Sequence, residues 1–568
     1  MPLIGLVCNT RMAAAALATD PPPSLGVGLH PARLSGWRLA LSPWALALVV
    51  AAPLAIVYLV LAPSSGDLAA ATYRGDLFAR AGFTLWDGGW YGGHDLPGYS
   101  LLAPAAGALL GERLLLALCA VAAAGLFGLL AQRTFQSAGA RVAGASFALG
   151  ACVGLLSGQV AYGLGLTVGL LALLMLIGGR TAAALTLAVL TSLASPVAGT
   201  FLALAGLAYA LAAPQGAHAG HRADGRGELR PRTRGLALAV ATLAPILALA
   251  VAFPEGGWEP FAPSLFWPAL AGVAAIAVML PHAGGKLAPH ARGALTWGAW
   301  LYALALTGAF VLRTPVGGNA ARLGVLLAAP LVAGVLWEHR RLALVLLAPA
   351  LLYWQMDTPI SDFAALAGNP SVNASYYAPL AGELTRLANG RPLRVEVPLT
   401  EAHWESVYIP EHPLILLARG WERQLDTRYD ALFYRPGLAP VTYRSWLIQN
   451  AVSYVALPDV RLDSAGEREG QLIARGLPYL IEVWHSAHWR LFAVQGATQL
   501  AQPPAALTGM GPDSFTLLTH RPGRFTVRVR FTPYWTVQQG RASLYRAPGG
   551  WTEVDALRAG ALRVGIDL

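Results

Sequence analysis

The aspartates that follow the first apolar segment are the side chains of this sequence best placed for acid–base chemistry. Asp67, Asp76, Asp87 and Asp95 lie between residues 64 and 104, directly after an uncharged run long enough to cross a bilayer. A carboxylate held in a fixed position can take a proton from a hydroxyl acceptor. We therefore predict Asp67 and Asp76 as catalytic residues, with Asp67 as the general base.

Further residues of the same stretch are candidates for substrate binding. They are Asp87, Trp90, Tyr91, His94 and Asp95. Aromatic rings can stack on the faces of sugars. A carboxylate such as that of Asp87 can orient an acceptor or a divalent ion.

A structural interpretation of this stretch stays open beside the catalytic one. At helical spacing the apolar residues fall on one side and Arg74, Asp76 and Arg80 on the other, which predicts a helix lying in the membrane interface. On this interpretation Asp67 is the N-cap of the helix. Asp76 then pairs with Arg80 four residues later, and the aromatic residues form an interfacial belt.

A second polar segment, "RTPVGGNAARLG", is expected on the same face of the membrane. Guanidinium groups bind phosphate oxygens in a forked geometry. Arg313, Asn319 and Arg322 are therefore candidate substrate-binding residues, and the two arginines are suited to hold a leaving phosphate. The alternative is that both arginines only extend from helix ends to the interface.

Composition identifies the class of protein that must position these residues. Of 568 residues, 55% are hydrophobic and 12% are charged, whereas about 25% of the residues of a typical soluble protein are charged. We predict a polytopic α-helical membrane protein with about eleven transmembrane helices. The apolar segments cover residues 42–62, 114–131, 142–157, 161–178, 181–194, 197–213, 235–253, 264–280, 293–312, 323–337 and 342–355.

The distribution of Lys and Arg predicts the orientation of the chain, because these residues are retained in short cytoplasmic loops. Fifteen of them lie on the side of the N-terminus and five in the opposite loops. We expect a disordered cytoplasmic tail at 1–41, a transmembrane domain at 42–355 with its first external loop at 63–104, and an extracytoplasmic domain at 356–568. The net charge of +10 follows from this topology and does not indicate nucleic-acid binding.

The segment after residue 356 has the composition of a separate domain. Runs such as "LRVEVPL", "VSYVALP" and "FTVRVRF" predict strands, and helical patches are expected at 376–388 and 443–450. The prediction is a mixed, β-rich extracytoplasmic domain of roughly 200 residues. His485 and His488 lack the further ligands of a zinc site, and no metal ligand is assigned.

The membrane part of the chain resembles the glycosyltransferases of the GT-C fold. The resemblance rests on Asp67 in a long first external loop, on "GFTLWD" at 82–87 and on "YGG" at 91–93. Within that superfamily the chain is most similar to uncharacterised bacterial membrane proteins, some labelled 6-pyruvoyl-tetrahydropterin synthase-related. The similarity covers about the first 355 residues.

The resemblance implies a reaction and a location. It implies that Asp67 is the catalytic base, that the donor is a polyprenyl-phosphate sugar, and that the protein lies in the bacterial inner (plasma) membrane. The acceptor is then an extracytoplasmic glycan, lipid or protein. Many members carry a second acid directly after this Asp, whereas Leu68 stands there in this chain. A divalent cation, Mg²⁺ or Mn²⁺, therefore stays open as a cofactor.

Two other functions stay open beside the enzyme. A transporter or flippase typically has internal repeats and ionisable groups at the midplane, whereas the polar residues here gather at one interface. The other possibility is a non-catalytic membrane scaffold whose exported domain binds a glycan or a partner. The gathering of polar residues favours the enzyme.

Overall fold

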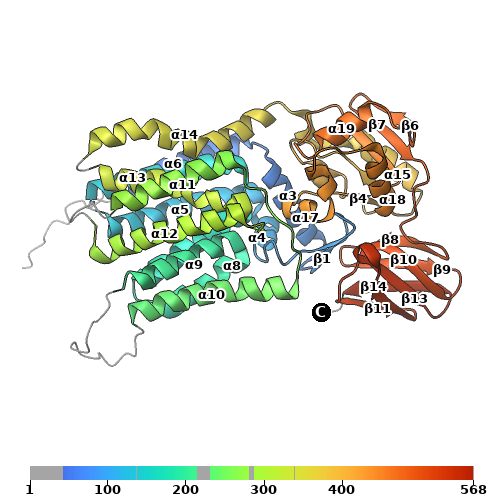
Figure 1. Cartoon of the computed structure of the whole chain (residues 1–568), viewed down its shortest axis with the longest axis horizontal. Coiled ribbons are helices and arrows are strands. Elements are labelled where there is room, and N and C mark those ends of the chain that lie inside the picture. Colours follow the sequence, from blue (N-terminus) through green and yellow to red (C-terminus); the bar gives the residue numbers. More distant parts are fainter. Residues whose placement is uncertain (1–41, 136, 214–229, 281–286, 338–339, 567–568) are drawn as a thin grey trace, which may run out of the picture. The chain divides into compact units, whose positions relative to one another are not determined.

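The computed structural model describes residues 42–135, 137–213, 230–280, 287–337 and 340–566 (Figure 1). In these residues eight helices are long and apolar enough to cross a bilayer, and α8, α9 and α11 are shorter apolar helices. The apolar helices are α2 (Pro43–Leu61), α5 (Glu112–Thr134), α6 (Ser137–Val153, followed by the 3₁₀ turn η1, Gly154–Ser157), α7 (Val160–Ile177), α8 (Thr181–Ala194), α9 (Pro196–Leu211), α10 (Pro231–Ala252), α11 (Pro263–Met279), α12 (Pro289–Val311), α13 (Arg322–Leu336) and α14 (Arg341–Leu366). Because backbone polar groups in hydrocarbon must be paired within the chain, an apolar run folds as a helix. The predicted polytopic architecture is confirmed.

Each predicted apolar segment coincides with one of these helices. The main difference lies at α14, which continues to Leu366, whereas the predicted segment ends at 355. The sequence becomes polar after Trp354, but a fall in hydrophobicity marks the edge of the apolar layer and not the end of a hydrogen-bonded helix. The predicted tail at 1–41 lies outside the described residues.

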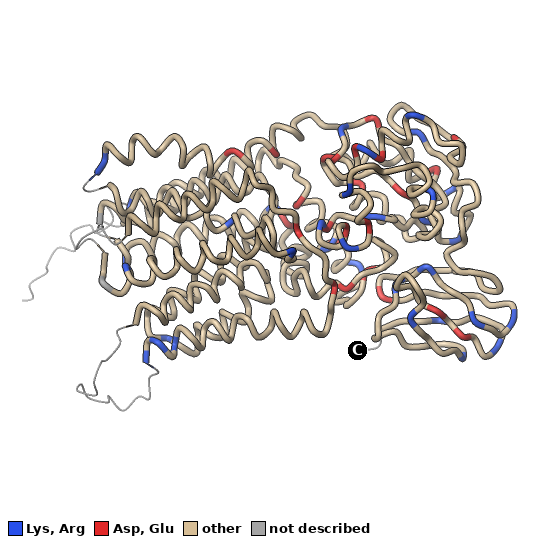
Figure 2. Tube along the Cα trace, in the orientation of Figure 1, with Lys and Arg blue, Asp and Glu red and all other residues tan. Residues whose placement is uncertain are grey.

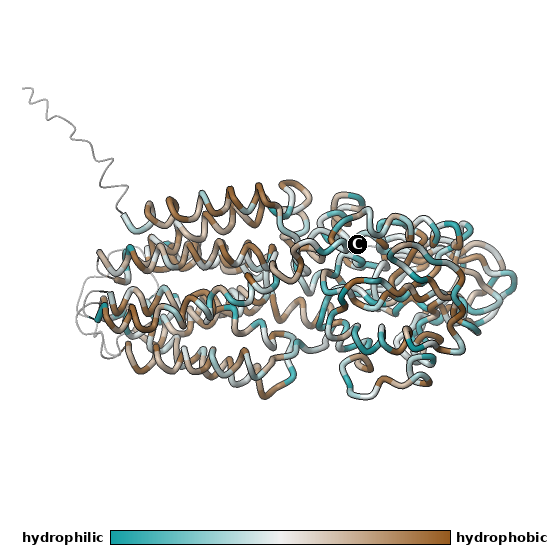
Figure 3. The backbone as a smooth tube through the Cα atoms, turned by 90° about the horizontal axis from the view of Figure 1, so that it is seen from above, coloured by the Kyte–Doolittle hydropathy of each residue, from teal (hydrophilic) through white to brown (hydrophobic). Residues whose placement is uncertain are grey.

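Charged residues are distributed unequally between the two ends of the helix bundle (Figure 2). At the helix ends away from the C-terminal sheets, the charged side chains that the structure describes are all arginines. They are Arg133, Arg141, Arg180, Arg230, Arg232, Arg234, Arg292, Arg340 and Arg341. Between the two ends the helices are predominantly hydrophobic (Figure 3).

The segment predicted as the first external loop folds as α3 (Gly66–Ala81), a short hairpin of β1 (Trp86–Asp87) and β2 (His94–Asp95), and α4 (Ala103–Leu110). The helix predicted in this segment is present as α3, with two corrections. Its N-cap is Ser65, whose hydroxyl accepts the N–H of Leu68 at 3.4 Å, so Asp67 is not the cap. Arg74 is buried rather than exposed, because it forms an ion pair with Glu422.

After α14 the chain forms a five-stranded mixed sheet in the order β4-β3-β5-β7-β6. The strands are β3 (Leu393–Glu396), β4 (Ile415–Leu417), β5 (Tyr454–Pro458), β6 (Leu480–His485) and β7 (Trp489–Val494). β3 is parallel to β4 and β5, whereas β7 is antiparallel to β5 and β6. The helices of this mixed-sheet unit are η5 (Pro370–Val372), α15 (Ala374–Ala388), α16 (Glu405–Tyr408), α17 (Arg423–Tyr429), η6 (Ala431–Tyr434), α18 (Pro440–Gln449) and α19 (Glu467–Ala474). The predicted helical patches correspond to α15 and α18.

The last part of the chain is a sandwich of two antiparallel sheets, ordered β10-β13-β12 and β11-β14-β9-β8. Its elements are β8 (Ala505–Met510), β9 (Ser514–Thr519), β10 (Gly523–Arg530), β11 (Trp535–Gln539), β12 (Ala542–Arg546), η7 (Pro548–Gly550), β13 (Trp551–Ala556) and β14 (Gly560–Ile566). Phe515 and Phe525 belong to its core, and Tyr443 and Phe492 belong to a core of the mixed-sheet unit. The β-rich region therefore packs around more than one hydrophobic core. Strand patterns do not show which strands pair, because pairing depends on contacts distant in sequence.

Candidate active site

The first turns of α3 and α13 bring two candidate residues together. Asp67 lies in the first turn of α3, and Arg322 is the first residue of α13, directly after the 3₁₀ turn η4 (Gly317–Ala321). Arg322 Nη2 lies 3.6 Å from Asp67 Oδ2, and the side chains are 26% and 36% exposed. The pair is thus held by two separate helices and reachable by a substrate, as a general base and a phosphate-binding cation require.

Two rings of the mixed-sheet unit cover the start of α3. The rings of His403 and Trp421 stack with their centroids 3.3 Å apart. A Cβ atom on Gly66 would lie 2.9 Å from the His403 ring. The rings therefore contact the backbone directly before Asp67, and a side chain at position 66 would push them away.

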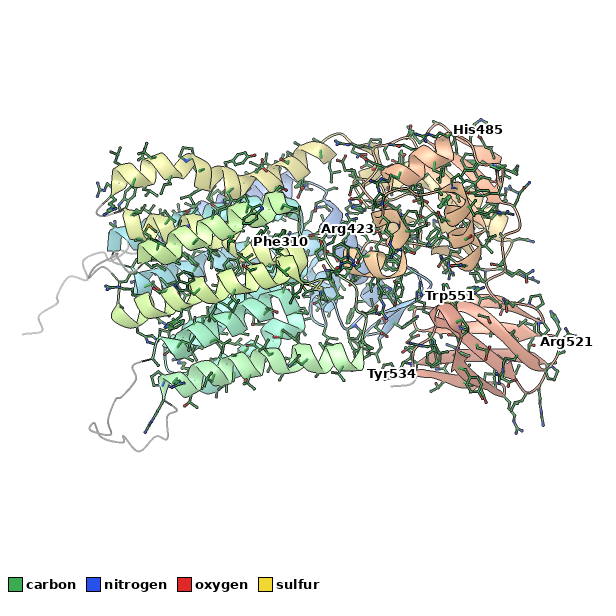
Figure 4. The ribbon with its side chains drawn as sticks, in the orientation of Figure 1. Phe310, Arg423, His485, Arg521, Tyr534 and Trp551 are labelled. Carbon is green, nitrogen blue, oxygen red and sulfur yellow. The ribbon has the colours of Figure 1, made fainter. Side chains whose placement is uncertain are left out.

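An arginine–aspartate pair extends this cluster at the boundary between the helices and the mixed-sheet unit (Figure 4). Arg423 donates hydrogen bonds of 3.0 and 2.8 Å to Asp463, and its guanidinium lies 4.7 Å from the ring centroid of Trp421. Burial acts to raise the pKa of Asp463, but His403 and Arg423 outweigh it and hold this pKa well below the usual range. Arg423 is therefore committed to Asp463, and Arg322 is the more accessible cation for a substrate phosphate.

A second carboxyl group, Glu259, belongs to the same site. Its backbone N–H donates to Thr314 O at 3.0 Å, which ties the α10–α11 loop to the segment before α13. Burial raises the pKa of Glu259 to about 7, against the lowering effects of Arg423 and Arg322. Groups that titrate near neutral pH in a partly open site are suited to proton transfer. The sequence analysis did not select Glu259, because the pattern "WEP" carries no sign of its burial.

The remaining candidates of the second polar segment lie around this site. The Arg313 guanidinium is exposed and lies 5.3 Å from the ring centroid of Trp258. Asn319 is a half-buried residue of η4, and its N–H donates to Val316 O at 2.9 Å. Arg322 is therefore the member of this segment that the structure places beside Asp67.

Asp76 lies on the opposite face of α3 from Asp67, and its predicted catalytic role stays a prediction. The separation of nine positions between Asp67 and Asp76 corresponds to about two and a half helical turns, so the two side chains leave α3 on opposite faces. Asp76 lies near Glu411, whose pKa is raised by burial and then by the charge of Asp76. Within the described residues Asp76 makes no direct ion pair with Arg80, so the predicted pair is absent there.

Four residues predicted to bind substrate are buried instead. Asp87, Trp90, Tyr91 and His94 are each at most 1% exposed. The Trp90 indole N–H donates to a backbone carbonyl of α16 at 3.0 Å, and Asp87 accepts a hydrogen bond of 2.9 Å from Tyr73. An aromatic and glycine-rich sequence is typical both of an interfacial belt and of a buried hairpin. The sequence does not distinguish the two, because the residues that cover this hairpin come from distant parts of the chain.

Asp95, at the end of the same hairpin, contacts a different loop. It is half-buried, and its backbone N–H donates to the carboxylate of Glu255 in the α10–α11 loop. Burial and then the charge of Asp95 raise the pKa of Glu255, and burial raises that of Asp95. The predicted role of Asp95 in substrate binding gains no direct support from this contact.

The buried hairpin positions the active-site cluster rather than lining it. The Tyr91 hydroxyl donates to Gly420 O at 2.7 Å and accepts the N–H of Glu422 at 3.1 Å. The carboxylate of Glu422 pairs with Arg74 of α3. Residues 420–423 include Trp421 and Arg423 of the cluster beside Asp67. The hairpin therefore fixes these two side chains against α3.

An apolar cavity of about 560 Å³ lies among α5, α7, α9, α11, α12 and α13. Along α7 its lining runs from Tyr162 to Ile177, which is a length of about 22 Å at 1.5 Å per residue. The Arg322 guanidinium lies 5.5 Å from the ring centroid of Tyr162, and the adjacent Leu323 lines the cavity. The cavity therefore extends from the arginine-rich helix ends, where Arg133 and His290 line it, to the neighbourhood of Arg322.

Among the described residues no group of three or more His, Cys, Asp or Glu is arranged to hold a metal ion. The closest charged partner of Asp67 is Arg322, and Leu68 occupies the next position. Mg²⁺ is usually held by one or two carboxylates together with the phosphates of a substrate, so a divalent cation, Mg²⁺ or Mn²⁺, stays an open assignment.

Comparison with known proteins gives distant structural similarities alone. No family model matches the chain, and no curated protein matches it significantly. Among solved structures, the oligosaccharyltransferase of Archaeoglobus fulgidus, determined with a tethered acceptor peptide, is similar over 74% of this chain and 69% of that chain. The sequence identity is 12% and the TM-score 0.37, values too low to carry a functional argument.

Proposed function

We propose that this protein is a GT-C-type membrane glycosyltransferase that transfers a sugar from a polyprenyl-phosphate donor to an extracytoplasmic glycan, lipid or protein. The observation that carries the proposal is the apolar cavity that extends to the neighbourhood of Arg322, the partner of Asp67. A long hydrocarbon chain suits such a cavity, and a guanidinium at its end suits the attached phosphate.

In the proposed reaction Asp67 acts as the general base. It takes the proton of an acceptor hydroxyl while the hydroxyl oxygen attacks the anomeric carbon of the donor sugar. The bond from this carbon to the phosphate oxygen breaks as the glycosidic bond forms, with inversion. Polyprenyl phosphate leaves with the bonding electrons, and Arg322 stabilises its negative charge. The proton on Asp67 then passes to solvent.

We infer that the arginine-rich helix ends are cytoplasmic and that the mixed-sheet unit and the sandwich are extracytoplasmic, in a bacterial inner membrane. The arginines at those ends support this orientation, because basic residues are retained inside. In a chain without native cysteines, an impermeant thiol reagent should label Ser464→Cys in intact cells. It should label Ala288→Cys only after the membrane is opened. Labelling of Ala288→Cys alone in intact cells would invert the orientation.

Filling the cavity should block the use of a lipid-linked donor. Ala205 of α9 lines the cavity. Ala205→Trp should therefore raise the KM for a polyprenyl-phosphate sugar by about 10-fold or more. Each methylene group of the polyprenyl chain that the indole excludes from the cavity costs about 0.8 kcal/mol of binding free energy, and the indole should exclude two or more. Transfer to a supplied acceptor by purified protein in detergent measures this. Ala275→Trp on α11, which is exposed on the outside of the bundle, is the matched control.

Three results separate the proposal from its alternatives. Equal KM values for Ala205→Trp and Ala275→Trp would show that the cavity does not hold the donor. A wild-type protein that moves a polyprenyl-phosphate sugar across a vesicle bilayer without transferring the sugar would support a flippase, for which a cavity about 22 Å long is also suitable. A protein that binds glycan but neither transfers nor moves the lipid would support the scaffold.

A further inference from the structure

Three arginines meet around one tryptophan where the sandwich joins the mixed-sheet unit. The guanidinium carbons of Arg394, Arg528 and Arg530 lie 5.8, 5.6 and 4.7 Å from the ring centroid of Trp551. Arg394 belongs to β3, the other two arginines to β10, and Trp551 begins β13. Figure 4 shows Trp551 at the edge of the sandwich that faces the hairpin. We call Arg394, Arg528 and Arg530 the arginine cluster.

The positive charge of the arginine cluster has no direct counter-charge. Within the described part of the chain, none of the three arginines forms an ion pair with a carboxylate. Their partners are backbone carbonyls: Arg394 donates to the carbonyls of Asn450 and Arg528 at 2.6 and 2.7 Å, and Arg530 donates to Tyr91 O at 2.8 Å. Carbonyl groups satisfy hydrogen-bond donors but do not neutralise charge.

Asp430 is the aspartate whose charge acts on the arginine cluster. It favours the charged forms of Arg394 and Arg530, but its carboxylate accepts the indole N–H of Trp446 at 2.9 Å. Burial, and then the charges of Arg530 and Arg528, lower the pKa of Arg394 to about 9. Asp430 therefore acts on Arg394 and Arg530 without forming an ion pair with either of them among the described residues.

Two donors of the arginine cluster point to a missing partner. The Nε atoms of Arg394 and Arg528 are buried and make no hydrogen bond among the described residues, and Arg394 is only 1% exposed. Val527 and Val529 face the core of the sandwich with no exposure. The alternating residues Arg528 and Arg530 therefore face the boundary, where half-buried Arg528 gives access from solvent.

We propose that the arginine cluster binds a small oxyanion of the phosphate, sulfate or carboxylate class, which enters beside Arg528. Uncompensated buried charges destabilise a protein, and guanidinium groups bind such oxyanions with good geometry. The bound anion strengthens the joint between sandwich, mixed sheet and hairpin, because Arg530 contacts Tyr91 and Arg394 lies on β3. The site does not depend on the proposed transferase function.

Thermal unfolding of the purified full-length protein tests this site. Sodium phosphate, added at constant ionic strength against chloride, should raise the unfolding midpoint of the wild type in a saturable manner. Arg528→Gln should weaken the apparent phosphate affinity by about 10-fold or more, the loss expected for a hydrogen bond to a charged group. Arg524→Gln is the matched control, because Arg524 lies on the same strand but already pairs with Glu553 and Asp555 at 3.4 and 3.3 Å.

The responses of the three proteins decide the proposal. An equal and non-saturating rise in all of them would be the general stabilising effect of excluded salts and would overturn it. Absence of any rise in the wild type would also overturn it, as would a failure of the wild type to retain labelled phosphate in equilibrium dialysis, a measurement that needs no variant. Competition by a hexose phosphate but not by the free hexose would assign the oxyanion to a phosphorylated glycan; competition by inorganic phosphate alone would assign it to the free ion.

Discussion

Replacement of Asp67 by Asn should abolish sugar transfer and leave the protein folded. Loss of a positioned general base lowers the rate by about 10²- to 10⁴-fold. The stability should change little, because Ser65 and not Asp67 caps α3 and because a partly exposed pair such as Asp67–Arg322 contributes about 1 kcal/mol or less. Steady-state transfer assays and thermal unfolding of the purified variant measure the two effects.

Asp76→Asn is the matched control for this experiment, since it makes the same chemical change on the opposite face of α3. We expect its transfer rate to stay close to that of the wild type. If Asp67→Asn retained about a tenth of the wild-type rate or more, Asp67 would not be the base. If Asp76→Asn lost as much activity as Asp67→Asn, both aspartates would act and the separation of the two faces would be functionally irrelevant.

Trp90→Ala should destabilise the whole protein, because Trp90 is a buried structural residue and not a sugar contact. Its side chain has no exposed surface, stacks on Tyr73 with centroids 4.2 Å apart and fills the space beside Gly420, where a Cβ atom would lie 2.3 Å from the indole. Truncation of a buried Trp to Ala typically costs about 3–5 kcal/mol. Thermal or denaturant unfolding in detergent should show a correspondingly lower stability.

The control for Trp90 is Trp267→Ala in α11, where the indole is 61% exposed on the outside of the bundle. This variant should unfold close to the wild type. If Trp90→Ala proved as stable as Trp267→Ala and instead raised the KM for an acceptor, the original prediction of a substrate contact would be right.

The sequence by itself determined where the helices of the membrane part lie. Each of the eleven apolar segments is a helix, because a chain in hydrocarbon must pair its own backbone groups and does so locally. The runs "LRVEVPL", "VSYVALP" and "FTVRVRF" were also predictable as strands, since alternation and β-branched residues report a half-buried pleated surface. They correspond to β3, β5 and β10, whereas strands such as β4 and β12 were not predicted. Both signals are local, which is why their positions agree with the structure to within a few residues at most ends. The end of α14 does not, because hydrophobicity and helical hydrogen bonding stop at different residues there.

Only the tertiary structure decided which polar residues meet. The sequence could not show that Asp67 faces Arg322, that Glu259 joins them, or that Asp76 turns away, because each of these depends on how separate helices are rotated and packed. It also could not show that Trp90 is covered, since the covering residues lie in the mixed-sheet unit. Composition and spacing report the solvent that each segment prefers, whereas a site is made by side chains that are distant in sequence and close only in the folded chain.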